Sequence, residues 1–261
     1  MTRVPVHSNE DLQSMRRAGA VIGNTLVLVA QAVEPGVTTA ELDRIAARSI
    51  EEAGAIASFP LEIHPTLGTA FPGVICASVN EEIVHGIPSD RKLESGDIVS
   101  IDIGAIYQGF HADAARTVAV GKITSQVRRL LEVTEEALRR GIEKVRPGAR
   151  LYEISAAIDQ YASVKGMGIV RQYVGHGIGR TMHEPPQIPN HRMDTPGPPL
   201  QPGWALAIEP MLNLGTEKTR VLDDGWTVVT ADGAPSAHFE HTVAVTPKGR
   251  WILTLPDDAA A

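Results

Sequence analysis

Cysteine is nearly absent from this 261-residue sequence, which contains only Cys76. A lone thiol cannot close an intrachain disulfide, and it cannot supply a cysteine-rich structural zinc site. The sequence therefore predicts a protein that works in a reducing compartment.

Long apolar runs are missing as well. The N-terminal residues lack the apolar core and the small-residue cleavage site of a secretory signal. The most apolar stretch, residues 21–33, is too short to span a bilayer and contains polar residues, so it is interpreted as a core helix. We expect a cytoplasmic protein with no membrane partner.

Runs of basic residues are also missing, because no run of Lys or Arg is longer than a pair and the formal net charge is -7. This pattern argues against direct binding of nucleic acid. The chain is 43% hydrophobic, which is enough for one large domain with a substantial core.

Two halves of the sequence repeat the same helical pattern. A Pro-Gly pair, a helical period of apolar residues and a final glycine occupy residues 35–54 and recur at 147–166, an offset of 112. Thr38 and Glu41 predict a capping box at the first of these helices. Further helical stretches precede the two segments, at 11–33 and 125–145.

The strand patterns repeat in the same order. Residues 93–102 match 200–209 at an offset of 107, and both segments end a buried strand on a carboxylate. His111-Ala112-Asp113 matches His238-Phe239-Glu240 at an offset of 127, and the 20 extra residues predict an inserted hairpin turned at residues 223–225. The sequence therefore predicts a single α+β domain in which two pseudo-symmetric halves, roughly 8–121 and 122–255, place strands in the middle and helices outside.

Four carboxylates lie in or beside these predicted strands. Asp102 and Glu209 each follow a run of apolar residues, where a charge is costly unless a cation accompanies it. Asp113 and Glu240 are expected to join them from the two halves. Divalent cations such as Mn, Fe, Co or Zn would relieve the repulsion, and two such ions roughly 3.5 to 4 Å apart commonly fill a set of this kind.

Several histidines complete the predicted site. His176 lies between glycines, and His183 and His85 lie beside rigid Pro or Gly turns, so all three can project into a cleft. The other histidines are interpreted as packed or surface residues, or as residues that orient neighbouring ligands: His7, His64, His111, His191, His238 and His241.

From residue 11 to residue 255 the sequence resembles the type I methionine aminopeptidases of the M24 metallopeptidase family. The resemblance lies in motifs around the proposed ligands and histidines: Asn80-Glu81, His85-Gly86-Ile87-Pro88, residues 96–102, 109–113 and 175–179, Ile208-Glu209-Pro210-Met211 and Glu240-His241-Thr242. It implies the pita-bread fold, with a central antiparallel sheet and outer helices.

The resemblance also implies roles for single residues. Asp102 and Asp113 would hold one divalent ion, and Asp113 and Glu240 would bridge to a second ion that His176 and Glu209 complete. His85 and His183 would lie beside the substrate, and the methionine pocket would be formed by Phe71, Cys76, Met182 and Trp226. A monovalent cation site is implied at the backbone of Asn80 and Glu82 with Ser236.

The implied reaction removes the N-terminal methionine from newly synthesised proteins whose second residue is small. Glu209 would carry the proton of the attacking water, His183 would stabilise the carbonyl oxygen, and His85 would serve the leaving nitrogen. A monomer that contacts the ribosome is the implied cellular form.

One segment departs from the family pattern. Gly68-Thr69-Ala70 replaces an aromatic run, so an aromatic wall of the methionine pocket is expected to be missing. Two alternatives remain: a proline-specific aminopeptidase on the same fold, and a non-catalytic binding module, although such modules lose ligands that this sequence keeps.

Overall fold

The computed structural model describes residues 3–257, and the first half of the chain begins with two helices. The strands follow the helices, as the sequence predicts. The elements of this half are α1 Asn9–Gln31, α2 Thr39–Glu52, β1 Ile56–Ala57, the short 3-10 helix η1 Phe59–Leu61, β2 Cys76–Val79, β3 Glu82–Val84, β4 Ile98–Tyr107 and β5 Phe110–Ala119.

The second half repeats the order of two helices followed by strands, which confirms the predicted repeat of elements. Its elements are α3 Ser125–Ile142, α4 Tyr152–Val164, β6 Gly168–Ile169, β7 Gly175–Gly177, β8 Glu184–Ile188, β9 Ala205–Ile208, β10 Met211–Asn213, β11 Thr219–Val221, β12 Val228–Thr230, β13 Ser236–His238, β14 His241–Thr246 and β15 Gly249–Ile252.

Local signals fix the ends of the helices. The Thr38 side chain accepts a hydrogen bond from the backbone of Glu41, whose carboxylate accepts one from the Thr38 backbone, so the predicted capping box is present. Gly54 and Gly166 follow α2 and α4 with positive φ of 68° and 72°, which glycine adopts without strain. The predicted glycine stops are therefore confirmed.

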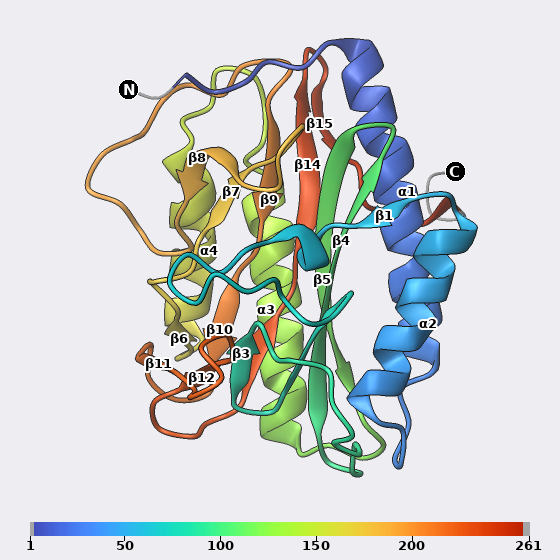
Figure 1. The fold of residues 1–261 in the computed structure, drawn as a ribbon. Helices are drawn as coiled ribbons and strands as arrows, with labels where there is room; N and C mark the ends of the chain where they lie inside the picture. The colour runs from blue at the N-terminus through green and yellow to red at the C-terminus, as the bar shows by residue number, and fades with distance from the viewer. Residues whose placement is uncertain (1–2, 258–261) are drawn as a thin grey trace.

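All the strand pairs are antiparallel, and they form several separately hydrogen-bonded sheets. In the first half β4 pairs with β1, β2 and β5, and in the second half the order is β15-β14-β9-β7-β8. The helices lie outside the strands, with α1 and α2 beside β4 and β5 (Figure 1). The predicted α+β arrangement is confirmed.

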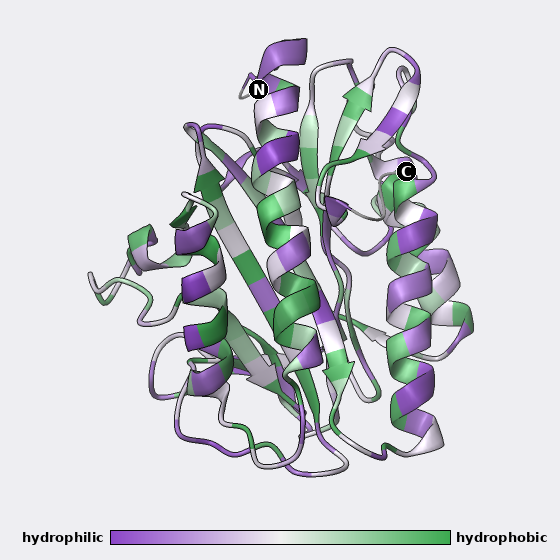
Figure 2. Cartoon of the chain, turned by 90° about the vertical axis from the view of Figure 1, so that its right-hand side faces the viewer, coloured by the Kyte–Doolittle hydropathy of each residue, from purple (hydrophilic) through white to green (hydrophobic). Residues whose placement is uncertain are grey.

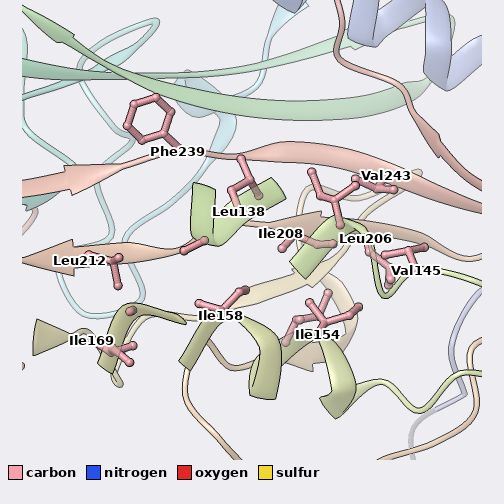
Figure 3. Close-up of a cluster of buried hydrophobic side chains, with 14 of the residues drawn as sticks. Leu138, Val145, Ile154, Ile158, Ile169, Leu206, Ile208, Leu212, Phe239 and Val243 are labelled. Atoms are coloured by element: carbon pink, nitrogen blue, oxygen red, sulfur yellow. The ribbon is translucent and has the colours of Figure 1, made fainter. Parts of the chain in front are cut away.

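Each half has its own hydrophobic core between helices and strands. Apolar side chains of α1 and α2 pack against β2, β4 and β5, and those of α3 and α4 pack against β9 and β14 (Figure 3). The helices carry polar and apolar bands, as expected for elements that bury only one face (Figure 2). Within residues 3–257 no helix has both the length and the hydropathy needed to cross a membrane.

The inserted hairpin predicted in the second half is also present. β11 and β12 pair antiparallel, and the turn between them includes Asp224, whose carboxylate accepts hydrogen bonds from the backbone of Trp226 and Thr227. β12 also pairs with β3 of the first half. The hairpin therefore carries Trp226 from the second half to strands of the first half.

Candidate active site

One cavity of about 250 Å³ is lined by most of the residues that the sequence singles out, although not by Met182, Asn80, Glu82 or Ser236. Its polar wall combines carboxylates with imidazoles, and its apolar wall combines aromatic with aliphatic side chains. The lining residues are Phe59, Glu62, Ile63, Pro65, Phe71, Cys76, Val84, His85, Asp102, Asp113, Tyr173, Val174, His176, His183, Glu209, Trp226 and Glu240.

The carboxylates reach this cavity from both halves of the fold. Asp102 lies within β4, and Asp113 lies on the neighbouring strand β5. Glu209 directly follows β9, and Glu240 lies between β13 and β14. His176 lies on β7, where Ala207 of β9 is its strand partner, so the imidazole is held beside Glu209.

The five side chains lie close together, and four of them are buried. Asp102, Asp113, His176 and Glu240 are all less than a tenth exposed. Asp113, His176 and Glu240 each offer a ligand atom, and these atoms lie within 4.8 Å of one another. His176 Nε2 is 3.6 Å from Glu209 Oε1. The five side chains are therefore close enough to act as ligands of one metal centre.

Burial raises the pKa of every carboxylate in the group, and repulsion between neighbouring carboxylates adds to this rise for Asp113, Glu209 and Glu240. Desolvation raises the pKa of Asp102 to about 7. The pKa of Asp113 rises well above its usual range because of burial and the nearby charges of Glu240 and Asp102. Burial and neighbouring carboxylates have the same effect on the pKa values of Glu209 and Glu240. Four ionised groups at this spacing need positive charge nearby.

The hydrogen-bonding state of these oxygens is a test of whether cations fit the site. Asp102 Oδ1, Asp113 Oδ1 and Glu240 Oε1 are buried, and none has a hydrogen-bond partner in the described part of the chain. Buried anionic oxygens without donors are costly unless they coordinate a metal. Carboxylate oxygens with one imidazole nitrogen are a donor set that suits Mn, Fe, Co or Zn. The residues therefore fit divalent cations.

The two other histidines line the same cavity in different environments. His85 is half-buried, and desolvation lowers its pKa to about 4, so its ring is neutral near pH 7. Its ring packs edge-on against Tyr173 at 5.8 Å. His183 is more exposed, with its ring 4.5 Å from that of His176 and its Nδ1 3.6 Å from Glu62 Oε2. Both imidazoles can meet a substrate next to the carboxylates.

The apolar wall contains most of the predicted methionine pocket. Phe71 packs edge-on against Trp226 at 5.2 Å, and both residues line the cavity with Cys76. Met182 packs in the same hydrophobic cluster, where its Cε lies so close to Gly104 that a side chain there would collide with it. The cluster therefore surrounds the pocket with soft and aromatic side chains.

A small hairpin replaces the aromatic run that the sequence lacks. Ile63 forms an antiparallel bridge with Ala70, and the His64 ring packs edge-on against Trp226 at 4.8 Å. Ile63 and Pro65 line the cavity together with Phe59. These wall residues were not predicted from the sequence. The same is true of Glu62, Val84, Tyr173 and Val174, because none of these residues belongs to a motif or a periodic pattern.

The residues proposed for a monovalent cation are partly brought together. The backbone N–H of Ser236 donates to the backbone oxygen of Asn80 at 2.9 Å, and Asn80 has a positive φ of 58°. The Glu82 carboxylate accepts from the Val79 backbone and pairs with Arg91. The proposed cation site stays a prediction.

Comparison with known proteins agrees with this geometry. The model of metallopeptidase family M24 matches residues 13–247. This chain belongs to the M24 family. The chain is 49% identical to the methionine aminopeptidase of Clostridium perfringens over 248 residues, which cover 95% of this chain and 97% of that protein.

Solved structures of M24-type proteins give the same result for the fold. The crystal structure of methionine aminopeptidase from Rickettsia prowazekii superposes with a TM-score of 0.91 at 40% identity, covering 97% of this chain and all of that chain. The prolidase from Pyrococcus furiosus has a TM-score of 0.77 at 22% identity, and this chain covers only 66% of it. The likeness to prolidase therefore extends to the pita-bread fold alone.

Proposed function

We propose that this M24 chain is a methionine aminopeptidase that removes the N-terminal methionine from newly synthesised proteins whose second residue is small. The observation that carries the proposal is the meeting of three buried carboxylates, the partly buried Glu209 and His176 beside an apolar pocket in one cavity. The relative from Clostridium perfringens, which bears the name methionine aminopeptidase, matches along nearly the whole chain.

Five residues are proposed to hold two divalent cations. Asp102 and Asp113 would hold one ion, and His176 and Glu209 would hold the other, with Asp113 and Glu240 shared by the two. The orphaned oxygens of Asp102, Asp113 and Glu240 support this assignment. When bound, such a pair lowers the pKa of water towards neutrality and binds the free amine of the substrate.

The remaining roles belong to side chains of the chain itself. Glu209 is proposed to accept the proton of the attacking water and to pass it to the departing amine. Burial raises the pKa of its carboxyl, which makes the carboxylate a stronger base. His183 donates a hydrogen bond to the carbonyl oxygen and stabilises its developing charge. His85, which is neutral and half-buried, holds the leaving nitrogen.

The pocket accounts for the choice of side chain. Phe71, Trp226 and Cys76 form an apolar surface without an ion pair, which suits an unbranched thioether. Binding of the free amine would restrict the reaction to the first residue. In the cell, we propose that a monomer acts on nascent chains as they leave the ribosome.

The test compares two substrate classes on one preparation. Metal-stripped protein is reloaded with Mn²⁺ or Co²⁺ and assayed on Met-Ala-Ser and on an Xaa-Pro peptide, with EDTA-treated protein as control. We expect metal-dependent release of methionine from Met-Ala-Ser only. Cleavage restricted to the Xaa-Pro peptide would establish the proline-specific alternative, and no cleavage with no bound metal would establish a binding module.

A further inference from the structure

A buried histidine next to the cavity has no role in the reaction proposed above. His238 ends β13 and is 1% exposed, and within residues 3–257 neither of its ring nitrogens has a hydrogen-bond partner. Its backbone is fixed, because its N–H donates to Thr117 Oγ1 and its carbonyl accepts from the same hydroxyl, both at 2.9 Å. The backbone therefore fixes the position of the ring, while its two nitrogens have no hydrogen-bond partner.

The repeat of the sequence supplies a direct comparison. His111 occupies the equivalent position in the first half, two residues before Asp113 as His238 is two residues before Glu240. His111 Nδ1 shares a hydrogen bond of 2.9 Å with the Ser58 hydroxyl. The histidine at this repeat position therefore has a hydroxyl group as its hydrogen-bond partner in the first half and none in the second half.

The His238 ring instead faces two of the proposed ligands. Its Nε2 lies 3.8 Å from Glu209 Oε2 and 3.9 Å from Glu240 Oε2. The other oxygen of Glu209, Oε1, lies 3.6 Å from His176 Nε2. Glu209 therefore stands between two imidazoles, one for each of its oxygens.

These distances are longer than a hydrogen bond of about 3 Å, so the ring and the carboxylates must approach one another before the bond forms. Hydrogen bonds in active sites are often long before the ligands are complete, and they shorten when the site is loaded. A purely packing role explains the ring less well, since a buried imidazole without partners costs free energy that a leucine in the same space would not.

We propose that His238 is a positioning residue that donates its Nε2–H to Glu209 Oε2 and thereby turns Oε1 towards His176 and the bound cation. The same donor lies within reach of Glu240 Oε2, so one ring orients ligands from two different strands. This inference rests on the proposed function. The role needs only the Nε2–H tautomer of the ring, which is available to neutral imidazole.

Three substitutions separate the donor from the volume of the ring. H238L fills the space without a donor. H238Q places an amide N–H close to the position of Nε2, and H238N places it close to Nδ1, facing away from the two carboxylates. H191L is the matched control, because His191 lies outside the cavity.

The measurements are the affinity for Mn²⁺ by calorimetry, and kcat and KM for Met-Ala-Ser. We expect H238L and H238N to bind Mn²⁺ roughly 10- to 100-fold more weakly than the parent and to lose kcat, with H238Q and H191L within a few-fold of the parent. If circular dichroism shows that H238L does not fold, the comparison of H238Q with H238N still tests whether the donor at Nε2 is needed.

Two outcomes overturn the inference while the proposed function stands: parent-like Mn²⁺ affinity in H238N, or an H238Q protein as weak as H238N. A parent protein that neither binds Mn²⁺ nor cleaves Met-Ala-Ser overturns the proposed function and this inference with it. The two failures are distinguished by the parent protein alone.

Discussion

The Thr242 hydroxyl joins the two halves of the molecule at a proposed metal ligand. Thr242 Oγ1 accepts a hydrogen bond from the backbone N–H of Asp113 at 2.9 Å and donates one to the backbone oxygen of Asp113 at 2.8 Å. A second bridge runs from the Glu240 backbone N–H to the oxygen of Ala115, also at 2.9 Å. The backbones of the proposed ligands Asp113 and Glu240 are therefore held in place by hydrogen bonds between β5 and both β14 and the segment that leads into it.

Substitution of Thr242 by Val tests this lock, because Val keeps the branched shape and loses the hydroxyl. The backbone N–H and C=O of Asp113 would be left buried without partners, at a cost of about 2 kcal/mol in the free energy of unfolding. We also expect weaker metal binding, since Asp113 is no longer held against β14. Urea unfolding and metal titration measure the two effects.

Thr246→Val is the matched control on the same strand. The Thr246 hydroxyl bonds to the oxygen of Gly249 at the half-buried edge of β14, away from the cavity. Its loss should cost less than about 1 kcal/mol and leave metal affinity unchanged. Equal losses of metal affinity in both variants would show that Thr242 has no special place at the site.

The metal-free protein should become less stable as pH rises above 6.5. A carboxyl whose pKa is raised by folding stabilises the protein below its unfolded pKa, and this stabilisation is lost as pH passes the folded pKa. For Asp102 the folded pKa is about 7, and for Asp113, Glu209 and Glu240 it is also raised. For Asp102 the loss is therefore expected up to about pH 7, and the other three carboxyls act in the same direction.

The buried histidines do not oppose this trend in that window. Desolvation lowers the pKa of His85 and His241 to about 4, and the pKa of His176 and His238 to about 3. Their stabilisation is complete above the unfolded value of about 6.5 and is lost only as pH falls.

Unfolding of EDTA-treated protein between pH 6.5 and 8 checks the sign. We expect the free energy of unfolding to fall by about 1.4 kcal/mol per pH unit for each proton released. Saturating Mn²⁺ should remove the slope, because metal binding keeps the ligands ionised in the folded state. A metal-free protein whose stability is flat or rises over this range would contradict the shared burial of the four carboxylates.

Much of the fold, and the meeting of the proposed ligands in one cavity, follows from the sequence. A buried strand that ends on Asp102 or Glu209 is a local signal, because apolar neighbours make an unpaired carboxylate costly. The Thr38 capping box and the glycines at 54 and 166 are local as well, and all of them have the predicted structure. The repeat then predicts that ligands from both halves meet.

Other features depend on contacts that no local pattern records. Ile63 and Pro65 line the cavity because a short hairpin packs on Trp226, which arrives from the other half of the chain. The different surroundings of His111 and His238 depend on Ser58, a residue far from both in sequence. Tertiary packing determines where the loops lie and how the two halves differ, so neither feature can be predicted from the sequence alone.

Three alanine substitutions should separate ligands from substrate-binding residues. Asp113→Ala and Glu240→Ala each remove a proposed bridging carboxylate, so we expect both to abolish activity and to lower the metal content. His85→Ala should reduce kcat by about 100-fold while metal stays bound, since His85 is assigned to the leaving nitrogen. Elemental analysis after gel filtration measures the metal, and equal metal content in the three proteins would disprove the assignment.

The hairpin of residues 62–70 should contribute to the choice of substrate. Ile63 lines the cavity although it is 59% exposed, whereas the neighbouring Leu61 is 57% exposed and lies outside the cavity wall. Ile63→Ala removes apolar surface that a methionine side chain would cover, so kcat/KM for Met-Ala-Ser should fall about fivefold, a change of about 1 kcal/mol. The loss should appear mainly in KM, because the ligands and His85 are untouched.

Leu61→Ala removes the same kind of side chain from a similarly exposed site and should leave kcat/KM unchanged. Equal losses in the two variants would mean that the hairpin acts through its own stability and not through contact with the substrate.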